Sequence, residues 1–183
     1  MIGRLPTSLN IDGKEYKIRT DYRDCLLIFQ AFNDVELTDY DKMQVTVQVL
    51  YENIPDNFEE AYSKAVWFLD CGDTVNKPHS KKPLYDFEQD EQMIFSAINK
   101  VANKEIRSVE YMHWWTFMGY FNEIGECQFS TVVSIRDKKQ KGKKLEKWEQ
   151  EYYRNNKETI ELKRKHTAQE QAELDALDAY LSS

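Results

Sequence analysis

The sequence predicts an all-α protein: a single domain of five or six helices, with a small N-terminal β-hairpin and a C-terminal helical extension. Apolar residues recur at spacings of three and four along most of the chain, as in helices that bury one face. Pro55, Gly72 and Gly125 stand where these patterns stop. The 183 residues are 41% apolar and 13% aromatic, which is enough for one packed core.

The first segment alternates apolar and polar residues on both sides of Asp12-Gly13, a pair that supplies the positive φ angles of a type I′ turn. Its apolar positions are Leu9, Ile11, Tyr16 and Ile18. A lone hairpin is marginal in water, so we expect it to lie on the helices. We divide the chain into an N-terminal β-hairpin (1–19), a helical body (20–135) and a charged C-terminal helical extension (136–183).

Two helices are predicted before Pro55. The first begins at Thr20, a plausible N-cap, runs to about Asn33 and has an apolar face of Tyr22, Cys25, Leu26 and Phe29. The second begins at Thr38, whose T-x-x-D pattern is a helix start, and proline forbids its continuation. Its β-branched alternation over 45–49 fits a strand equally, and we favour the helix.

A third helix is predicted over 57–70, with its apolar stripe at Phe58, Tyr62, Ala65 and Leu69. Trp67 lies opposite this stripe. It is either an exposed anchor for a partner, because Trp is enriched in binding hot spots, or a residue that packs against another helix. Residues 72–84 combine Gly, Pro, Asn, Ser and Lys without periodicity, which predicts a surface loop.

The fourth helix is expected to begin near Asp86, with an apolar cluster of Phe87, Ile94, Ala97, Ile98 and Val101. Asp90 and Glu91 fall at the edges of that stripe. Adjacent residues on a helix point about 100° apart, so these carboxylates do not form an acid/base pair. We expect a structural role in the first turn, with Asp90 paired to Arg23 or Arg136.

The fifth helix is predicted over 108–124 and is apolar nearly all round, including Trp114 and Trp115, so it is either central or partly covered by a partner. His113 lies on its apolar side and is interpreted as a hydrogen-bonded core histidine. Gly125 ends this helix. A short helix over 127–135 should then close the core.

Charge is distributed unevenly. The net charge is −7, yet residues 136–166 carry twelve Lys or Arg against six Asp or Glu, a local balance of +6. Nearby aromatic residues allow nucleic-acid binding through 136–166, but interspersed glutamates favour an extended, solvated helical face. Thr167 and Glu170 match a capping box, and Leu174, Leu177 and Leu181 follow at spacings of three and four. This tail helix either docks on a partner protein or folds back onto its own domain.

No catalytic, metal or cofactor pattern is present in the sequence. His79, His113 and His166 lie in separate segments, and none sits beside a second ligand at i+3 or i+4. Three widely spaced cysteines give neither a metal pair nor an even disulfide set. We therefore expect a non-enzymatic protein without cofactors. No apolar run reaches the roughly 18–20 residues of a membrane span, so we expect no membrane partner.

Three segments carry a resemblance: DYRDCL (21–26), YDFEQDEQMIFSAI (85–98) and MHWWTFMGYFNEIGECQFSTVVSIRDKK (112–139). Together they resemble a family of bacteriophage and prophage tail-module proteins from Gram-positive siphophages, encoded beside the tape-measure gene. Its most specific part is the run His113-Trp114-Trp115 followed by Ser134-Ile135-Arg136.

The resemblance implies a tail assembly chaperone in the cytoplasm of the bacterial host. Such a protein binds the coiled-coil tape-measure protein and other tail assembly proteins, and a homo-oligomer is compatible with this role. The alternatives are a structural virion component, such as a tail connector or completion protein, and nucleic-acid binding through 136–166. A virion component would be found in purified particles, whereas a chaperone would be absent.

Overall fold

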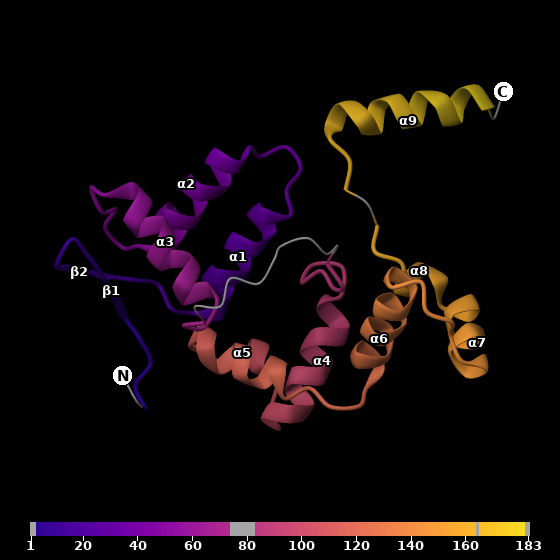
Figure 1. Ribbon diagram of the computed structural model, residues 1–183, viewed down its shortest axis with the longest axis horizontal. Coiled ribbons are helices and arrows are strands. Elements are labelled where there is room, and N and C mark those ends of the chain that lie inside the picture. The colour runs from indigo at the N-terminus through magenta and orange to yellow at the C-terminus, as the bar shows by residue number, and fades with distance from the viewer. Residues whose placement is uncertain (1–2, 74–82, 164, 182–183) are drawn as a thin grey trace.

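The computed structural model describes residues 3–73, 83–163 and 165–181. In these residues it contains nine α-helices, one 3-10 helix and one two-stranded sheet, which confirms the all-α class with an N-terminal hairpin (Figure 1). The elements are β1 (Ser8–Ile11), β2 (Lys14–Lys17), α1 (Tyr22–Phe32), α2 (Asp39–Leu50), α3 (Phe58–Leu69), α4 (Glu91–Ala102), η1 (Ile106–Ser108), α5 (Trp114–Asn122), α6 (Gln128–Gln140), α7 (Lys147–Asn155), α8 (Lys157–Ile160) and α9 (Ala168–Leu181).

The N-terminal strands form the expected antiparallel hairpin, with Leu9 opposite Tyr16. Asp12 and Gly13 have φ angles of 48° and 80°, as a type I′ turn requires. The hairpin packs on α3, where Glu60 accepts a hydrogen bond of 2.9 Å from the Asp12 amide. It therefore lies on the helical body, as its marginal intrinsic stability demands.

The start of α1 differs from the expectation by one residue. Asp21, not Thr20, is the N-cap, and its carboxylate accepts the Arg23 amide at 3.0 Å. The Thr20 carbonyl accepts the Trp114 amide at 2.7 Å, so Thr20 belongs to an extended segment paired with the chain before α5. Tertiary hydrogen bonding thus delays the helix.

Residues 45–49, whose β-branched alternation fitted a strand or a helix, lie within helix α2. The choice of the helix is confirmed. Thr38 and Asp41 form a reciprocal capping box, with hydrogen bonds of 3.2 Å and 3.0 Å to each other's amides. Helix α3 ends as predicted, because Cys71 and Gly72 adopt φ angles of 56° and 82° that stop it.

Two predicted helix starts were wrong. Helix α4 begins at Glu91 rather than near Asp86. The residues before it form a separate turn, which is closed by a hydrogen bond from the Asp90 amide to the Asp86 carbonyl. Helix α5 begins at Trp114 rather than at Ser108. The preceding segment is held against the chain before α1, where the Met112 carbonyl accepts the Tyr22 amide at 3.0 Å. Its backbone groups are therefore not available for a helix.

The main core is rich in aromatic rings contributed by α1, α3, α4 and α5. Tyr22 and Phe117 stack with their planes 1° apart and their centroids separated by 4.8 Å. Trp114 is fully buried, and its indole N–H donates to the Leu69 carbonyl at 2.9 Å. Helix α5 is thus central, because its apolar faces contact several helices at once.

His113 is buried and caps α5. Its Nδ1 accepts the Trp115 amide at 3.0 Å, and its Nε2 lies 2.9 Å from the Pro6 carbonyl, which confirms a hydrogen-bonded core histidine. Since Nδ1 accepts, Nε2 carries the proton and donates to Pro6. Burial lowers the pKa of His113, and the bond to Pro6 opposes that shift only partly.

Stability should therefore decline as the pH falls below about 6.5, the ordinary histidine pKa. There the unfolded chain binds a proton that the folded chain excludes, at a slope of no more than about 1.4 kcal/mol per pH unit. His113→Asn keeps an N-cap acceptor but does not titrate. Urea unfolding of this variant should show a flatter dependence between about pH 7 and pH 5.5 than the wild type. Equal slopes would contradict this assignment.

The basic segment is not one extended solvated helix. Helix α6 runs without a break across residues 135 and 136, where we had placed the start of the extension. It ends at Gln140, Gly142 then reverses the chain with a φ of 65°, and α7 and α8 fold back. Val132, Ile135 and Ile160 form a second buried cluster there. Apolar residues spaced far apart in the sequence therefore make this segment part of the folded body.

Candidate protein-binding site

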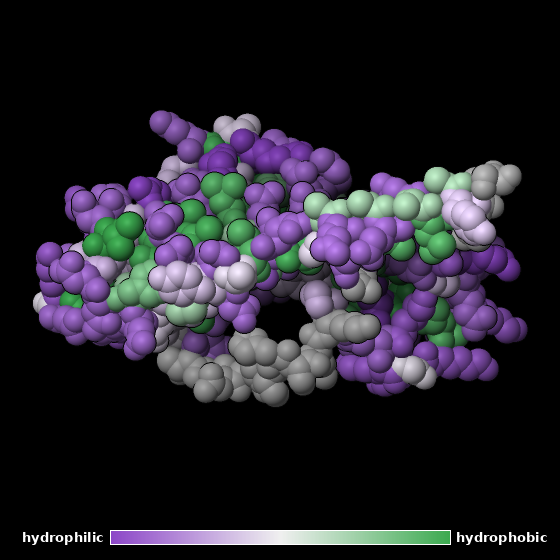
Figure 2. Space-filling view, turned by 90° about the horizontal axis from the view of Figure 1, so that it is seen from above, coloured by the Kyte–Doolittle hydropathy of each residue, from purple (hydrophilic) through white to green (hydrophobic). Residues whose placement is uncertain are grey.

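Helix α9 is not covered by any other part of the chain that the structure describes. It stands apart from the other helices in Figure 1, and in the view from above its apolar residues are open to solvent (Figure 2). Leu174 is 40% exposed and Leu177 is 52% exposed. The side chain of Leu181 lies outside what the structure describes. The helix does not fold back onto its own domain, and its leucine stripe contacts no core cluster of the described residues.

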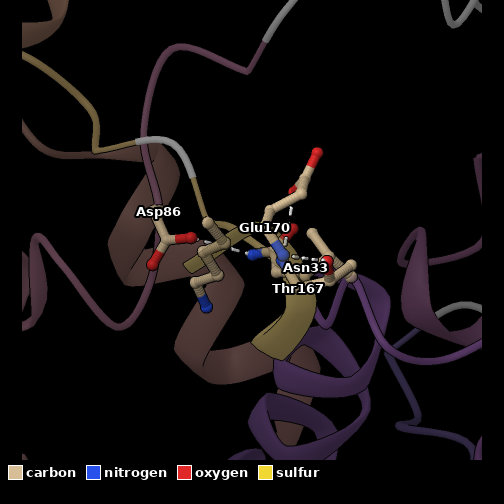
Figure 3. Close-up of a pocket in the computed structure, with 6 residues that line it drawn as sticks. Asn33, Asp86, Thr167 and Glu170 are labelled. Atoms are coloured by element: carbon tan, nitrogen blue, oxygen red, sulfur yellow. Dashed lines mark hydrogen bonds between the residues drawn. The ribbon is translucent and has the colours of Figure 1, made fainter. Parts of the chain in front are cut away.

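The first turn of α9 is anchored to the loop after α1. Thr167 and Glu170 form the predicted capping box, with both amide bonds at 3.1 Å. The Ala168 amide donates to the carboxylate of Glu36. Beside this contact lies a cleft of about 500 Å³, seen in Figure 3, lined by Asn33, Val35, Asp86, Lys165, Thr167 and Glu170.

The chain leading into α9 is held by the turn that precedes α4. The Gln89 side chain donates to the Glu161 carbonyl at 2.9 Å and accepts the Lys163 amide at 2.8 Å. Lys165 pairs with Glu88 at 2.7 Å, and this bond raises the pKa of the lysine. These residues could not be predicted from the sequence, because nothing in the order Glu88-Gln89 distinguishes them from residues on a solvated helix face.

Asp90 and Arg136 form a buried, bidentate ion pair that fixes this turn. Their side chains are 0% and 7% exposed, and the two bonds measure 2.6 Å and 2.9 Å. The guanidinium also donates to the carbonyls of Leu84, Thr159 and Ile160, so all its N–H groups are used. The pair joins α4, α6 and α8 and has a structural role.

Arg23, the other arginine proposed for Asp90, lies elsewhere. It pairs with Asp21 at 3.1 Å and donates to the Val109 carbonyl at 2.7 Å, so it fastens the start of α1 to the segment before α5. It reaches these partners because it lies only two residues after the N-cap. Asp90 pairs instead with Arg136 of α6.

Trp67 is half-buried. Its ring meets that of Trp115 at a centroid distance of 5.6 Å, and both rings pack over Gly72. A Cβ at Gly72 would lie 3.1 Å from Trp115 and 3.3 Å from Trp67, so glycine permits this packing. Of the two roles considered, the structure shows packing against another helix, and its use as a partner anchor remains a prediction.

No group of three His, Cys, Asp or Glu among the described residues could hold a metal ion. Burial raises the pKa of the Cys25 thiol and raises that of Cys71 to about 11, so both are protonated at neutral pH and are weak nucleophiles. His79 lies outside the described residues. His166 lies 3.6 Å from Glu170 at the root of α9.

No helix among the described residues is long and apolar enough to cross a membrane. Fold and site together define a predominantly helical protein in which helix α9 exposes two leucines to solvent. The chain belongs to the Bacteriophage Gp15 protein family, whose model matches residues 1–162. No curated protein and no solved structure matches the chain. Helix α9 lies beyond the matched residues.

Proposed function

We propose that this phage protein is a non-enzymatic tail assembly chaperone that binds the tape-measure protein in the host cytoplasm, with α9 as the contact. The observation that carries this proposal is the exposure of Leu174 and Leu177 on a helix that nothing in the described chain covers. Membership of a phage protein family and the resemblance to tail-module proteins support the phage setting.

The physical argument starts from the instability of α9 alone. An isolated helix of fewer than about 15 residues is marginal in water, so α9 gains order when its stripe is covered. Burying each leucine contributes roughly 1.5–3 kcal/mol. Leucines at i, i+3 and i+7 match the groove of a helical partner, and a tape-measure coiled coil presents such grooves before the tail tube encloses it.

Co-expression with the neighbouring coiled-coil gene tests the proposal. Leu174→Asp/Leu177→Asp places two charges in the stripe and should abolish solubilisation and pull-down of that protein. Ala172→Asp/Ala176→Asp is the matched control, because it adds the same charge to exposed positions on the opposite face of α9.

Two results would overturn the proposal. The coiled-coil protein could remain insoluble with the wild-type chain, or the leucine variant could solubilise it as well as the control does. A structural virion component is the alternative role. Mass spectrometry of purified particles separates the two, because a chaperone should be absent from them.

A further inference from the structure

A compact basic surface lies where α6 ends and α7 begins. We call it the basic corner, and its residues are Lys141, Lys143, Lys144, Lys147 and Trp148. All five are exposed, and the Trp148 side chain is 58% exposed. Lys141 pairs with Asp137 at 2.6 Å, whereas the other three lysines make no ion pair within the described part of the chain. The corner thus combines several exposed cations with one exposed aromatic ring in a short stretch of chain.

The corner is rigidly supported. The Lys143 amide donates to the Lys138 carbonyl at 2.8 Å and closes the end of α6. Glu149, only 2% exposed, accepts from the Lys138 ammonium at 2.7 Å and from the Glu146 amide at 2.8 Å. These bonds lower the pKa of Glu149, so it remains charged at neutral pH. A rigid surface loses little entropy when it binds.

Helix α9 has the complementary character. Residues 167–183 contain four acidic residues and neither Lys nor Arg. The four are Glu170, Glu173, Asp175 and Asp178, all within the residues of α9. An acidic helix of about 21 Å in length that exposes leucines fits a basic surface that carries an exposed aromatic ring.

Helix α9 cannot reach the basic corner of its own chain. In Figure 1, α9 lies above α8 in the view and α7 lies below α8. Gln89 binds the linker at Glu161 and Lys163, and Glu88 binds it at Lys165. Folding α9 back onto its own α7 would break these contacts. A second copy of the chain meets no such constraint.

We propose that α9 of one copy docks on the basic corner of a second copy, with the leucine stripe on Trp148 and the acidic residues on the lysines. In a two-fold dimer the same contact forms twice and leaves neither helix uncovered. The dimer is a property of the free protein and does not rest on the proposed chaperone role. The dimer would keep α9 covered until a partner protein displaces the second copy.

Sedimentation velocity of the full chain tests the dimer. The wild type should form a species of twice 21.8 kDa that dissociates as salt is raised, because salt screens exposed charges. Lys143→Glu/Lys144→Glu/Lys147→Glu should weaken the dimer about 100-fold. Adding Glu173→Lys/Asp175→Lys/Asp178→Lys to that variant should restore it. The control, Lys64→Glu/Lys100→Glu/Lys104→Glu, makes the same charge change at exposed lysines elsewhere and should dimerise normally.

Three outcomes would overturn the proposal. One is a wild type that stays monomeric at about 100 µM. Another is a dimer that survives reversal of the corner charges. The third is a monomeric chain whose corner lysines instead bind a fluorescent single-stranded oligonucleotide, which would assign the corner to nucleic acid. Circular dichroism of each variant verifies that it is folded.

Discussion

Asp90→Ala should lower the free energy of unfolding by roughly 3–5 kcal/mol, because it leaves the Arg136 charge buried without its partner. The ion pair is almost completely shielded from water, so solvent does not screen it. Asp90 also accepts the Asp86 amide at 3.0 Å, and its loss would free the turn before α4. That turn carries Gln89, so the linker to α9 should loosen as well.

Urea unfolding measures the effect, with Glu91→Ala as the control. Glu91 is the exposed neighbouring carboxylate, and its loss should cost well under about 1 kcal/mol. Arg136→Lys keeps the charge but cannot form the bidentate fork or reach all the carbonyl acceptors, so it should also destabilise strongly. An Asp90→Ala protein that unfolds at the same urea concentration as the wild type would refute the structural role.

Truncation after Thr167 should leave the melting temperature within about 2 °C of the full chain while abolishing partner solubilisation. The stability should persist because the described side chains from Gln171 to Tyr180 are all exposed and α9 is absent from both buried clusters. The function should be lost because the leucine stripe is removed. Self-association should disappear for the same reason.

The matching control is truncation after Leu181, which retains the whole of α9 and should keep both partner solubilisation and self-association. Differential scanning fluorimetry reports stability, and co-expression reports solubilisation. A protein truncated after Thr167 that melts much earlier would show that α9 supports the fold. One that still solubilises the tape-measure protein would assign the binding role to residues 1–167, which include the part that matches the family model.

Local sequence determined the features whose energy is local. The type I′ hairpin at Asp12-Gly13, the capping box at Thr38 and the stop at Gly72 each depend on a few neighbouring residues and stand where they were predicted. The same holds for the capping box at Thr167. Helical periodicity likewise predicted the all-α class, because burying one face of each helix requires only the spacing of apolar residues.

Features that depend on contacts between residues far apart in the sequence could not be predicted from local patterns. The sequence offered Arg23 and Arg136 equally to Asp90, and only the approach of α6 to α4 decided between them. The site at the root of α9 depends in the same way on Gln89, which is unremarkable until the linker passes it.

The sequence by itself therefore determined the class of fold, most helix ends and the spacing of the leucines on α9. Tertiary structure decided where α5 begins, because the segment before it gives its hydrogen bonds to the chain around Thr20 and Tyr22. It also decided that the basic segment folds back, because Ile160 completes a core with Val132 and Ile135. In both cases contacts far apart in the chain outweighed a local preference, since burial and backbone pairing contribute more free energy than intrinsic propensity does.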